Sequence, residues 1–251
     1  MRRPFQGLWN VIRFNWPFYV LALGLMPVVL VIRYFMPLQF RVAADFLLIF
    51  AAILTLLSLA VSWYVYDLAG FYRLDWLAKL QSGSSATIIN INAGFDETSE
   101  LLKSRFPDAE MIVYDFYDPA KHTEASIKRA RAAYPPFPGT RQVTTGELPL
   151  GADSADRIFA IFSAHEIRKA DERRAFFFEL NRILSPNGQV VVVEHLRDAS
   201  NYLAYNIGAL HFHSRESWLD TFAAARLDIE DEIKLTPFVT AFFLKKHGTA
   251  S

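Results

Sequence analysis

The 251-residue chain contains no cysteine. Disulfide bonds, zinc sites built on thiolates and thiol nucleophiles are therefore excluded. The chain also lacks an excess of charge of either sign, because 26 Lys and Arg balance 26 Asp and Glu. A nucleic-acid-binding protein normally carries a basic excess that neutralises phosphates, so we expect no nucleic-acid partner.

Charge is also missing from two long stretches near the N-terminus. Phe46 to Tyr66 contains no charged residue and matches the ~20 residues that a helix needs to cross a bilayer. Trp16 to Met36 is equally long and carries one charge, Arg33, whose long side chain can reach the interface. We predict transmembrane helices over about 16–36 and 45–66; buried core helices are the alternative.

Basic residues flanking the predicted helices indicate their orientation. Arg2, Arg3 and Arg13 precede the first helix, against Arg33 and Arg41 in the loop. The positive-inside rule then places both termini in the cytoplasm. We therefore expect an integral protein of the inner (cytoplasmic) membrane, with the C-terminal part of the chain facing the cytoplasm.

Residues 1–67 form the predicted membrane anchor, and residues 68–85 connect it to a C-terminal domain. The end of the second helix is rich in aromatic residues that suit the membrane interface, namely Trp63, Tyr64 and Tyr66. Asp67 to Leu80 mixes apolar and charged residues at roughly helical spacing, which predicts a helix lying on the membrane or packed on the C-terminal domain. Gln81 to Ser85 has the composition of a flexible linker.

From residue 86 onward, short apolar runs alternate with stretches of helical periodicity. Strands are predicted at 88–91, 111–114, 141–144, 157–162, 189–194, 228–235 and 238–244. Helices are predicted at 98–106, 119–134, 171–184 and 214–225. The second of these helices places on its solvent side Lys128, Arg129 and Arg131. The alternation predicts an α/β domain over 86–251 with a doubly wound, mostly parallel sheet.

Ligands in such a sheet bind at the carboxyl ends of the strands, where the strand order reverses. The first strand ends in Asn90-Ile-Asn-Ala-Gly-Phe-Asp96, which turns into a helix around Gly94. Asp115 ends the second strand about 20 residues after Gly94, where an acidic residue holds ribose hydroxyls in nucleotide-binding folds. A helix cap or turn residue is the alternative role for Asp115.

Three later segments carry a family resemblance. They are Glu147-Leu-Pro-Leu150 followed by Asp153, Phe162-Ser-Ala-His-Glu-Ile167, and Glu179-Leu-Asn-Arg-Ile-Leu-Ser-Pro-Asn-Gly188. With them, residues 86–246 resemble the class I S-adenosylmethionine-dependent methyltransferases, especially the branch of ubiquinone and menaquinone biosynthesis. The resemblance implies a Rossmann-like fold with an antiparallel last strand, and S-adenosyl-L-methionine as the cofactor.

The same resemblance identifies cofactor-binding residues. The family has an acidic residue and then three glycines at alternate positions, which here are Asn90, Asn92, Gly94 and Asp96, so only the middle glycine is kept. Asn92 tolerates a positive φ, and Asp96 can cap the next helix. The further positions implied to contact the cofactor are Asp115, Phe116, Glu147, Leu148 and Phe162.

Four of the six histidines follow predicted strands or lie in the region where the family builds its acceptor pocket. Methyl transfer to oxygen or carbon requires removal of a proton, and histidine suits that task. The candidate catalytic residues are His165, His195, His213 and Glu166, and each single histidine has a structural role as its alternative. The candidate substrate-binding residues are Tyr202, Tyr205, His211 and Arg215.

A metal site is a further interpretation of these histidines. His211 and His213 with His195 or Glu194 could supply three ligands. A two-residue histidine spacing suits strands, however, and nothing else in the sequence supports a metal, so we expect none.

These observations lead us to expect a membrane-anchored S-adenosylmethionine-dependent methyltransferase. Its expected partners are the lipid bilayer and a lipophilic acceptor: a quinone, an isoprenoid or a phospholipid. The altered loop at Asn92 and Asp96 supports an alternative, a non-catalytic membrane protein that uses a degenerate methyltransferase fold for binding or assembly. An NAD-dependent oxidoreductase is a third interpretation, and the helix–turn–strand run ending at Gly188 argues against it.

Overall fold

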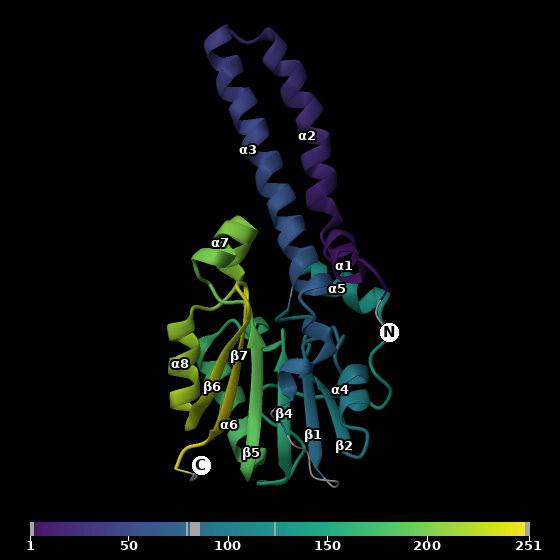
Figure 1. The fold of residues 1–251 in the computed structure, drawn as a ribbon, viewed down its shortest axis with the longest axis vertical. Coiled ribbons are helices and arrows are strands. Elements are labelled where there is room, and N and C mark those ends of the chain that lie inside the picture. The colour runs from purple at the N-terminus through teal and green to yellow at the C-terminus, as the bar shows by residue number, and fades with distance from the viewer. Residues whose placement is uncertain (1–2, 79, 81–85, 123, 249–251) are drawn as a thin grey trace.

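The computed structural model describes residues 3–78, 80, 86–122 and 124–248. It contains an α/β domain from which a long helical hairpin projects (Figure 1). The strands are β1 (Thr87–Asn92), β2 (Glu110–Asp115), β3 (Arg141–Gln142), β4 (Ala155–Ile161), β5 (Leu184–Glu194), β6 (Leu227–Thr236) and β7 (Val239–Lys246). The helices of the domain are α4 (Ser99–Arg105), α5 (Ala125–Ala133), α6 (Ala170–Ile183), α7 (Ala199–Tyr205) and α8 (Arg215–Ala224).

The strands form one seven-stranded sheet in the order β3-β2-β1-β4-β5-β7-β6. The strands from β1 to β5 pair in parallel, whereas β7 is antiparallel to both β5 and β6. The predicted doubly wound sheet with an antiparallel last strand is confirmed. Dinucleotide-binding sheets have the order 3-2-1-4-5-6, so the insertion of β7 argues against the oxidoreductase interpretation.

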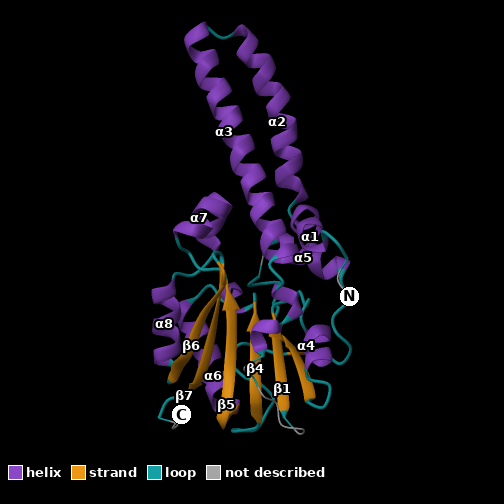
Figure 2. Cartoon of the chain, in the orientation of Figure 1, coloured by secondary structure: helices purple, strands orange, loops and turns teal. Residues whose placement is uncertain are grey.

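Side-chain alternation on β5 explains why the predicted strand is an unbroken valine run. Val190 and Val192 belong to one core cluster, with Trp218 and Phe222 of α8, while Val191 and Val193 belong to the other. Because both faces of a parallel strand are covered, every position favours an apolar side chain. Figure 2 shows helices on both sides of the sheet.

The segment that follows the hairpin is packed on the sheet rather than extended along a membrane surface. A π-helical turn, Tyr64–Leu68, is followed by two 3-10 turns, Phe71–Arg73 and Asp75–Leu77. Phe71 and Leu77 are buried in the second core cluster. Over its described residues the segment 67–80 is therefore not one continuous helix. Of its two predicted placements, the structure shows packing on the C-terminal domain, where its apolar side chains find partners on the sheet. The predicted linker 81–85 lies outside the described residues.

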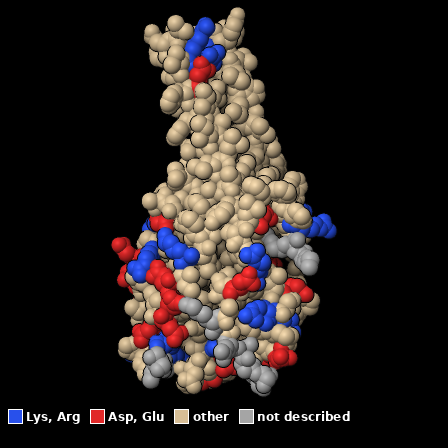
Figure 3. Space-filling view, in the orientation of Figure 1, with Lys and Arg blue, Asp and Glu red and all other residues tan. Residues whose placement is uncertain are grey.

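Helices α2 (Trp16–Phe35) and α3 (Leu38–Trp63) form the hairpin. Only Met36 and Pro37 separate them, a shorter loop than the predicted Arg33 to Arg41. Figure 3 shows an uncharged surface along the hairpin with charge at its tip, where Arg33 pairs with Asp45. By length and composition, both helices could cross a membrane.

Helix α1 (Gln6–Phe14), which was not predicted from the sequence, packs against the base of the hairpin. The carboxylate of Asp67 accepts hydrogen bonds from the backbone N–H groups of Gly7 and Leu8, both at 2.9 Å. These amides belong to the first turn of α1, where N–H groups lack partners within the helix. Asp67 therefore fixes α1 beside the π-helical turn.

A Gly7→Ala substitution is expected to lower the free energy of unfolding by about 1–3 kcal/mol, the usual cost of overpacking. An added Cβ would lie 2.3 Å from Cβ of Tyr66, an atom that moves only with its backbone. Thermal unfolding of the full chain in detergent, followed by circular dichroism, measures the effect. Gly24→Ala is the matched control, because no described atom lies within 4 Å of its added Cβ. Equal unfolding of both variants would contradict the close packing of α1.

Candidate active site

A cavity of about 220 Å³ lies at the carboxyl ends of the strands, beside the base of the hairpin. It is close to the position where the strand order reverses between β1 and β4. Helix α1, the π-helical turn, α5 and the loops after β1, β4 and β5 all contribute to its wall. The lining includes Asn10, Phe14, Tyr66, Tyr72, Phe95, Glu97, Ile127, Phe162, His165, His195 and Phe212.

The loop after β1 is held by side chains in place of the missing glycines. Gly94 has φ of 94°, and its N–H donates to Oδ1 of Asn92 at 3.1 Å. Oδ1 of Asp96 accepts from the backbone N–H groups of Thr98 and Ser99, at 3.0 and 2.9 Å. Asp96 therefore caps the start of α4, as its residue type indicates.

Three polar atoms of this loop are buried without a hydrogen-bond partner among the described residues: Oδ1 of Asn90, Nδ2 of Asn92 and Oδ2 of Asp96. A buried polar atom without a partner costs about 1–3 kcal/mol. The set comprises one amide donor, one carbonyl acceptor and one carboxylate oxygen. It is complementary to a ligand that carries both a carboxylate and an ammonium group.

Asp115 at the end of β2 forms an ion pair with Arg131 of α5. Its Oδ1 also accepts from the backbone N–H of Tyr117 at 2.8 Å. The guanidinium of Arg131 lies 4.5 Å from the centre of the Tyr117 ring. A Cβ on Gly94 would come within 3.0 Å of both side chains. Arg131 thus occupies the space between the glycine turn and the Asp115 carboxylate.

His195 lies at the end of β5 between two aromatic rings. Its ring is stacked on Phe162 and Phe212, with centroid distances of 5.1 and 4.9 Å. Nδ1 donates to the carbonyl oxygen of Phe238 at 2.9 Å, so Nε2 is an acceptor for the hydroxyl of Tyr66 at 2.8 Å. Burial, together with the nearby charge of His165, lowers the pKa of His195 to about 4. His195 is therefore neutral near pH 7.

A cluster of histidines and glutamates lies beside the His195 ring and connects the loop after β4 to the segment Asn206–His211. Nδ1 of His165 contacts Oε2 of Glu194 at 2.6 Å, and Nδ1 of His211 contacts Oε1 of Glu124 at 2.6 Å. Glu166 lies between the two imidazoles. Burial alone would lower the pKa of His165, but Glu194 and Glu166 outweigh it and raise the pKa to about 10. Hydrogen bonds from both histidines outweigh burial at Glu166 and hold its pKa far below the usual range.

Several predicted site residues lie away from the cavity. Nε2 of His213 is 3.0 Å from the Arg173 guanidinium, and burial together with that charge lowers the pKa of His213 to about 3. Arg215 pairs with Glu232 on the exposed side of α8. Phe116 and Leu148 are buried in the core. The remaining two are exposed: Glu147 and Tyr202.

The structure also brings in residues that were not selected from the sequence. Tyr66 was expected at the membrane interface, and its hydroxyl instead reaches His195. Arg131 was expected on the solvent side of its helix, and it turns inward to Asp115. Glu194 was considered from the sequence as an alternative to His195 in a metal site, not as a partner of His165. Its position next to a histidine at the end of a strand was the sequence feature that could have identified it.

Acidification is expected to destabilise the folded chain through His195. Its pKa is about 4 when folded and about 6.5 when unfolded. Between these values the unfolded chain binds more protons, so stability falls as the pH falls, by up to about 1.4 kcal/mol per pH unit. Urea unfolding from about pH 7 to about pH 4.5 should show a shallower pH dependence in His195→Gln. Parallel curves for the variant and the parent chain would refute this assignment.

The α/β domain is similar to known methyltransferases. Residues 81–192 match the family described as "Methyltransferase domain". The Ubiquinone/menaquinone biosynthesis C-methyltransferase UbiE of Syntrophotalea carbinolica is 25% identical over 174 residues, which are 66% of this chain and 68% of that protein.

Two solved structures share the fold. An O-methyltransferase family 2 protein from Planctomyces limnophilus, in complex with apigenin, gives a TM-score of 0.53 at 15% identity, covering 77% of this chain and 61% of its own. A S-adenosylmethionine-dependent methyltransferase from Clostridium acetobutylicum gives 0.51 at 11% identity, covering 71% and 91%. At these identities the structural likeness concerns the fold alone.

Proposed function

Because this chain is a class I S-adenosylmethionine-dependent methyltransferase, we propose that the α2–α3 hairpin anchors it in a membrane and that its acceptor is lipophilic. The observation that carries the proposal is the contact between Tyr66 and His195. Tyr66 belongs to the turn that ends the second apolar helix, and His195 directly follows strand β5. The base of the hairpin is therefore a wall of the site.

S-adenosylmethionine supplies an electrophilic methyl group on a sulfonium centre. The loop after β1 fits its methionine end, because the unpartnered atoms of Asn90, Asn92 and Asp96 complement a carboxylate and an ammonium group. Asp115 fits the ribose end, since a carboxylate accepts hydrogen bonds from both ribose hydroxyls. Its pairing with Arg131 means that the ribose and the guanidinium compete for one carboxylate.

The acceptor's route starts at the hairpin. A larger cavity of about 550 Å³ lies at its base, lined by Phe5, Trp63 and Arg73 among others. Tyr66 and Tyr72 line both this cavity and the smaller one that holds His195. An apolar acceptor leaving the bilayer along α3 would reach the first cavity and then pass the side chains of Tyr66 and Tyr72 to the second.

We assign removal of the acceptor's proton to His195. Its Nδ1–H is fixed on the Phe238 carbonyl, so the lone pair of Nε2 points toward the Tyr66 hydroxyl. An acceptor hydroxyl that takes the place of this hydroxyl would be oriented by the same nitrogen. Its proton becomes far more acidic as the methyl group is transferred, so a weak base held in position suffices.

Quinones are the preferred acceptors among lipophilic molecules, since the similar protein from Syntrophotalea carbinolica acts in ubiquinone/menaquinone biosynthesis. We further propose that the domain lies on the cytoplasmic side of the inner membrane. Arg3 and Arg13 flank the first helix on the domain side, in keeping with the positive-inside rule.

The test compares one acceptor headgroup with and without its prenyl chain. Full-length protein in lipid nanodiscs is incubated with S-adenosylmethionine labelled in its methyl group, and the label is counted in the organic extract. We expect the prenylated quinol to be methylated faster by a factor of ten or more, as burial of a few methylenes allows. Equal rates for both headgroups would overturn the lipophilic acceptor. Release of the chain from membranes by carbonate would overturn the anchor.

The alternative of a non-catalytic binding module predicts a different result. Such a protein would bind S-adenosylhomocysteine or an acceptor and transfer no label to any of the quinol, isoprenoid or phospholipid extracts. Two observations favour it: the altered loop at Asn92 and Asp96, and the pairing of Asp115 with Arg131, which fills the ribose position.

A further inference from the structure

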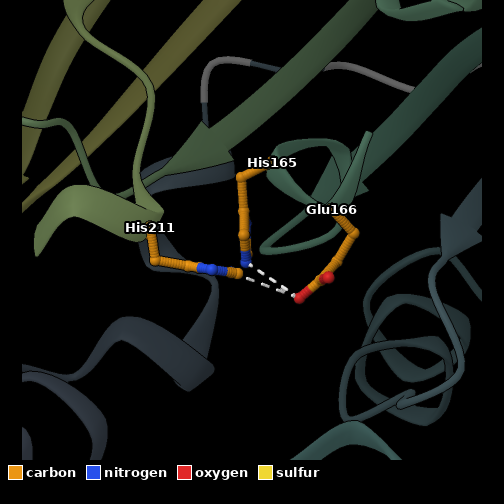
Figure 4. A group of neighbouring side chains, drawn as sticks. All are labelled: His165, Glu166 and His211. Carbon is orange, nitrogen blue, oxygen red and sulfur yellow. Dashed lines mark ion pairs between the residues drawn. The ribbon is translucent and has the colours of Figure 1, made fainter. Parts of the chain in front are cut away.

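Two histidines and a glutamate converge on one point beside the cavity (Figure 4). His165 and Glu166 come from the 3-10 turn after β4, Ala164–Glu166, and His211 ends the 3-10 segment Asn206–His211. Nε2 of His165 lies 3.4 Å from Oε1 of Glu166, and Nε2 of His211 lies 3.5 Å from the same oxygen. The ligand atoms of the three residues all lie within 4.8 Å of one another.

We propose that His165, Glu166 and His211 bind a divalent transition-metal ion. Two ligands bound to one ion at about 2.1 Å with tetrahedral angles are about 3.4 Å apart. The two nitrogen–oxygen separations here match that edge length. Two imidazoles and one carboxylate are a ligand set for Zn²⁺, Fe²⁺ or Mn²⁺, whereas Mg²⁺ and Ca²⁺ prefer oxygen ligands alone.

The contacts of the other ring nitrogen, Nδ1, independently support a metal site. Nδ1 of His165 is paired with Glu194 and Nδ1 of His211 with Glu124, each at 2.6 Å. Metal-binding histidines almost always donate their other N–H to a carboxylate or carbonyl, which fixes the tautomer. Both histidines show this arrangement, and both direct Nε2 toward Glu166. No metal was expected from the sequence, where His211 was grouped with His213, which the structure places against Arg173.

Charge and access support the same site. Three carboxylates surround the site, those of Glu124, Glu166 and Glu194. Arg168 lies nearby and donates to the His165 and His211 carbonyls. A divalent ion together with the Arg168 guanidinium would balance the three negative charges. Glu166 is 5% exposed, yet it lines a cavity of about 90 Å³ together with His165 and Phe162. The ion would therefore have open positions on the cavity side, as catalytic metal sites do.

The location indicates a use, which rests on the proposed function. An oxygen of the acceptor bound at an open position would be held beside His195 and Phe162 and would lose its proton more readily. Metal binding itself does not depend on this use. Measuring the ion directly therefore separates failure of the metal site from failure of the methyltransferase assignment.

The experiment titrates Co²⁺ into the full-length chain in detergent after treatment with a chelator. Visible d–d absorption reports the ligand field, and competition with a chromophoric chelator gives the affinity for Zn²⁺. We expect one equivalent of either ion in the parent chain. His211→Ala and Glu166→Gln should lose the high-affinity equivalent, and Glu124→Ala should weaken binding by about 10–100-fold, as expected for a carboxylate that orients a ligand.

His247→Ala is the matched control, because His247 is an exposed histidine paired with Asp228 just after β7, which ends beside the amino end of β5. It should bind as the parent chain does. Circular dichroism of each variant confirms that its fold is retained. Absence of Co²⁺ absorption in the parent chain would overturn the proposal. So would absorption that survives both His211→Ala and Glu166→Gln.

Discussion

An Asp115→Ala variant is expected to bind S-adenosylhomocysteine about 100-fold more weakly than the parent chain. Hydrogen bonds from two ribose hydroxyls to a carboxylate contribute about 1.5–3 kcal/mol each, and a loss of about 3 kcal/mol corresponds to roughly 100-fold in affinity. Asp115 is buried at the carboxyl end of β2, so its carboxylate is held in place before the ligand binds. Calorimetric titration into the full chain in detergent measures the change.

An Arg131→Met variant is expected to bind S-adenosylhomocysteine more tightly than the parent chain, the opposite of the Asp115→Ala effect. Arg131 forms an ion pair with the Asp115 carboxylate, so its removal frees the ribose partner and should tighten binding. Asp118→Ala is the matched control, because Asp118 lies in the loop after Asp115 and its side chain accepts, among the described residues, only from the Ala120 N–H. Tight binding that survives Asp115→Ala would place the ribose elsewhere. Weaker binding in Arg131→Met would show that Arg131 contacts the ligand rather than competing with it.

A Glu194→Ala variant is expected to lose about 3–5 kcal/mol of stability, which is the usual cost of removing one partner of a buried ion pair. Glu194 is fully buried, and it accepts from both the backbone N–H and Nδ1 of His165. Without it Nδ1 of the imidazole and the backbone amide lose their acceptor at a position with little access to water. Urea unfolding of the chelator-treated chain measures the loss.

Glu194→Gln should recover part of that stability, because its amide oxygen still accepts one hydrogen bond from His165. Glu100→Ala, an exposed glutamate on α4, should change stability by less than about 0.5 kcal/mol. A Glu194→Ala variant as stable as Glu100→Ala would mean that the His165 imidazole does not depend on this carboxylate.

The fold was predictable because its signal repeats along the chain. The apolar run from Val190 to Val193 fits a strand covered on both faces, and so does the run Ile88 to Ile91 in β1. The segment Phe71 to Leu77 was not predictable in the same way. Its apolar residues have helical spacing, yet Gly70 and Leu74 adopt positive φ, and the chain breaks into short turns to fill a gap on the sheet. Local periodicity does not reveal such a gap.

The site was predictable where strand ends determine it. His165 and His195 follow adjacent parallel strands, so their approach follows from topology. The place of Tyr66 in the site was not predictable, because an aromatic residue at a helix end has the same sequence pattern whether it faces lipid headgroups or a ligand. Arg131 was misplaced for a similar reason. A short helix with several basic residues has a plausible solvent face in any orientation, and the position of α1 decides which one turns inward.

With the hairpin in a membrane as proposed, the unequal lengths of its two helices would set the depth at which the cavity meets the bilayer. α2 has 20 residues and α3 has 26, which correspond to about 30 Å and about 39 Å. With the hairpin inserted as proposed, a hydrocarbon core of about 30 Å takes up α2 and leaves about 9 Å of α3 outside on the domain side. That distance is comparable to the headgroup layer. The polar head of an acceptor would then be methylated while its tail stays dissolved in the lipid, and no extraction step would limit turnover.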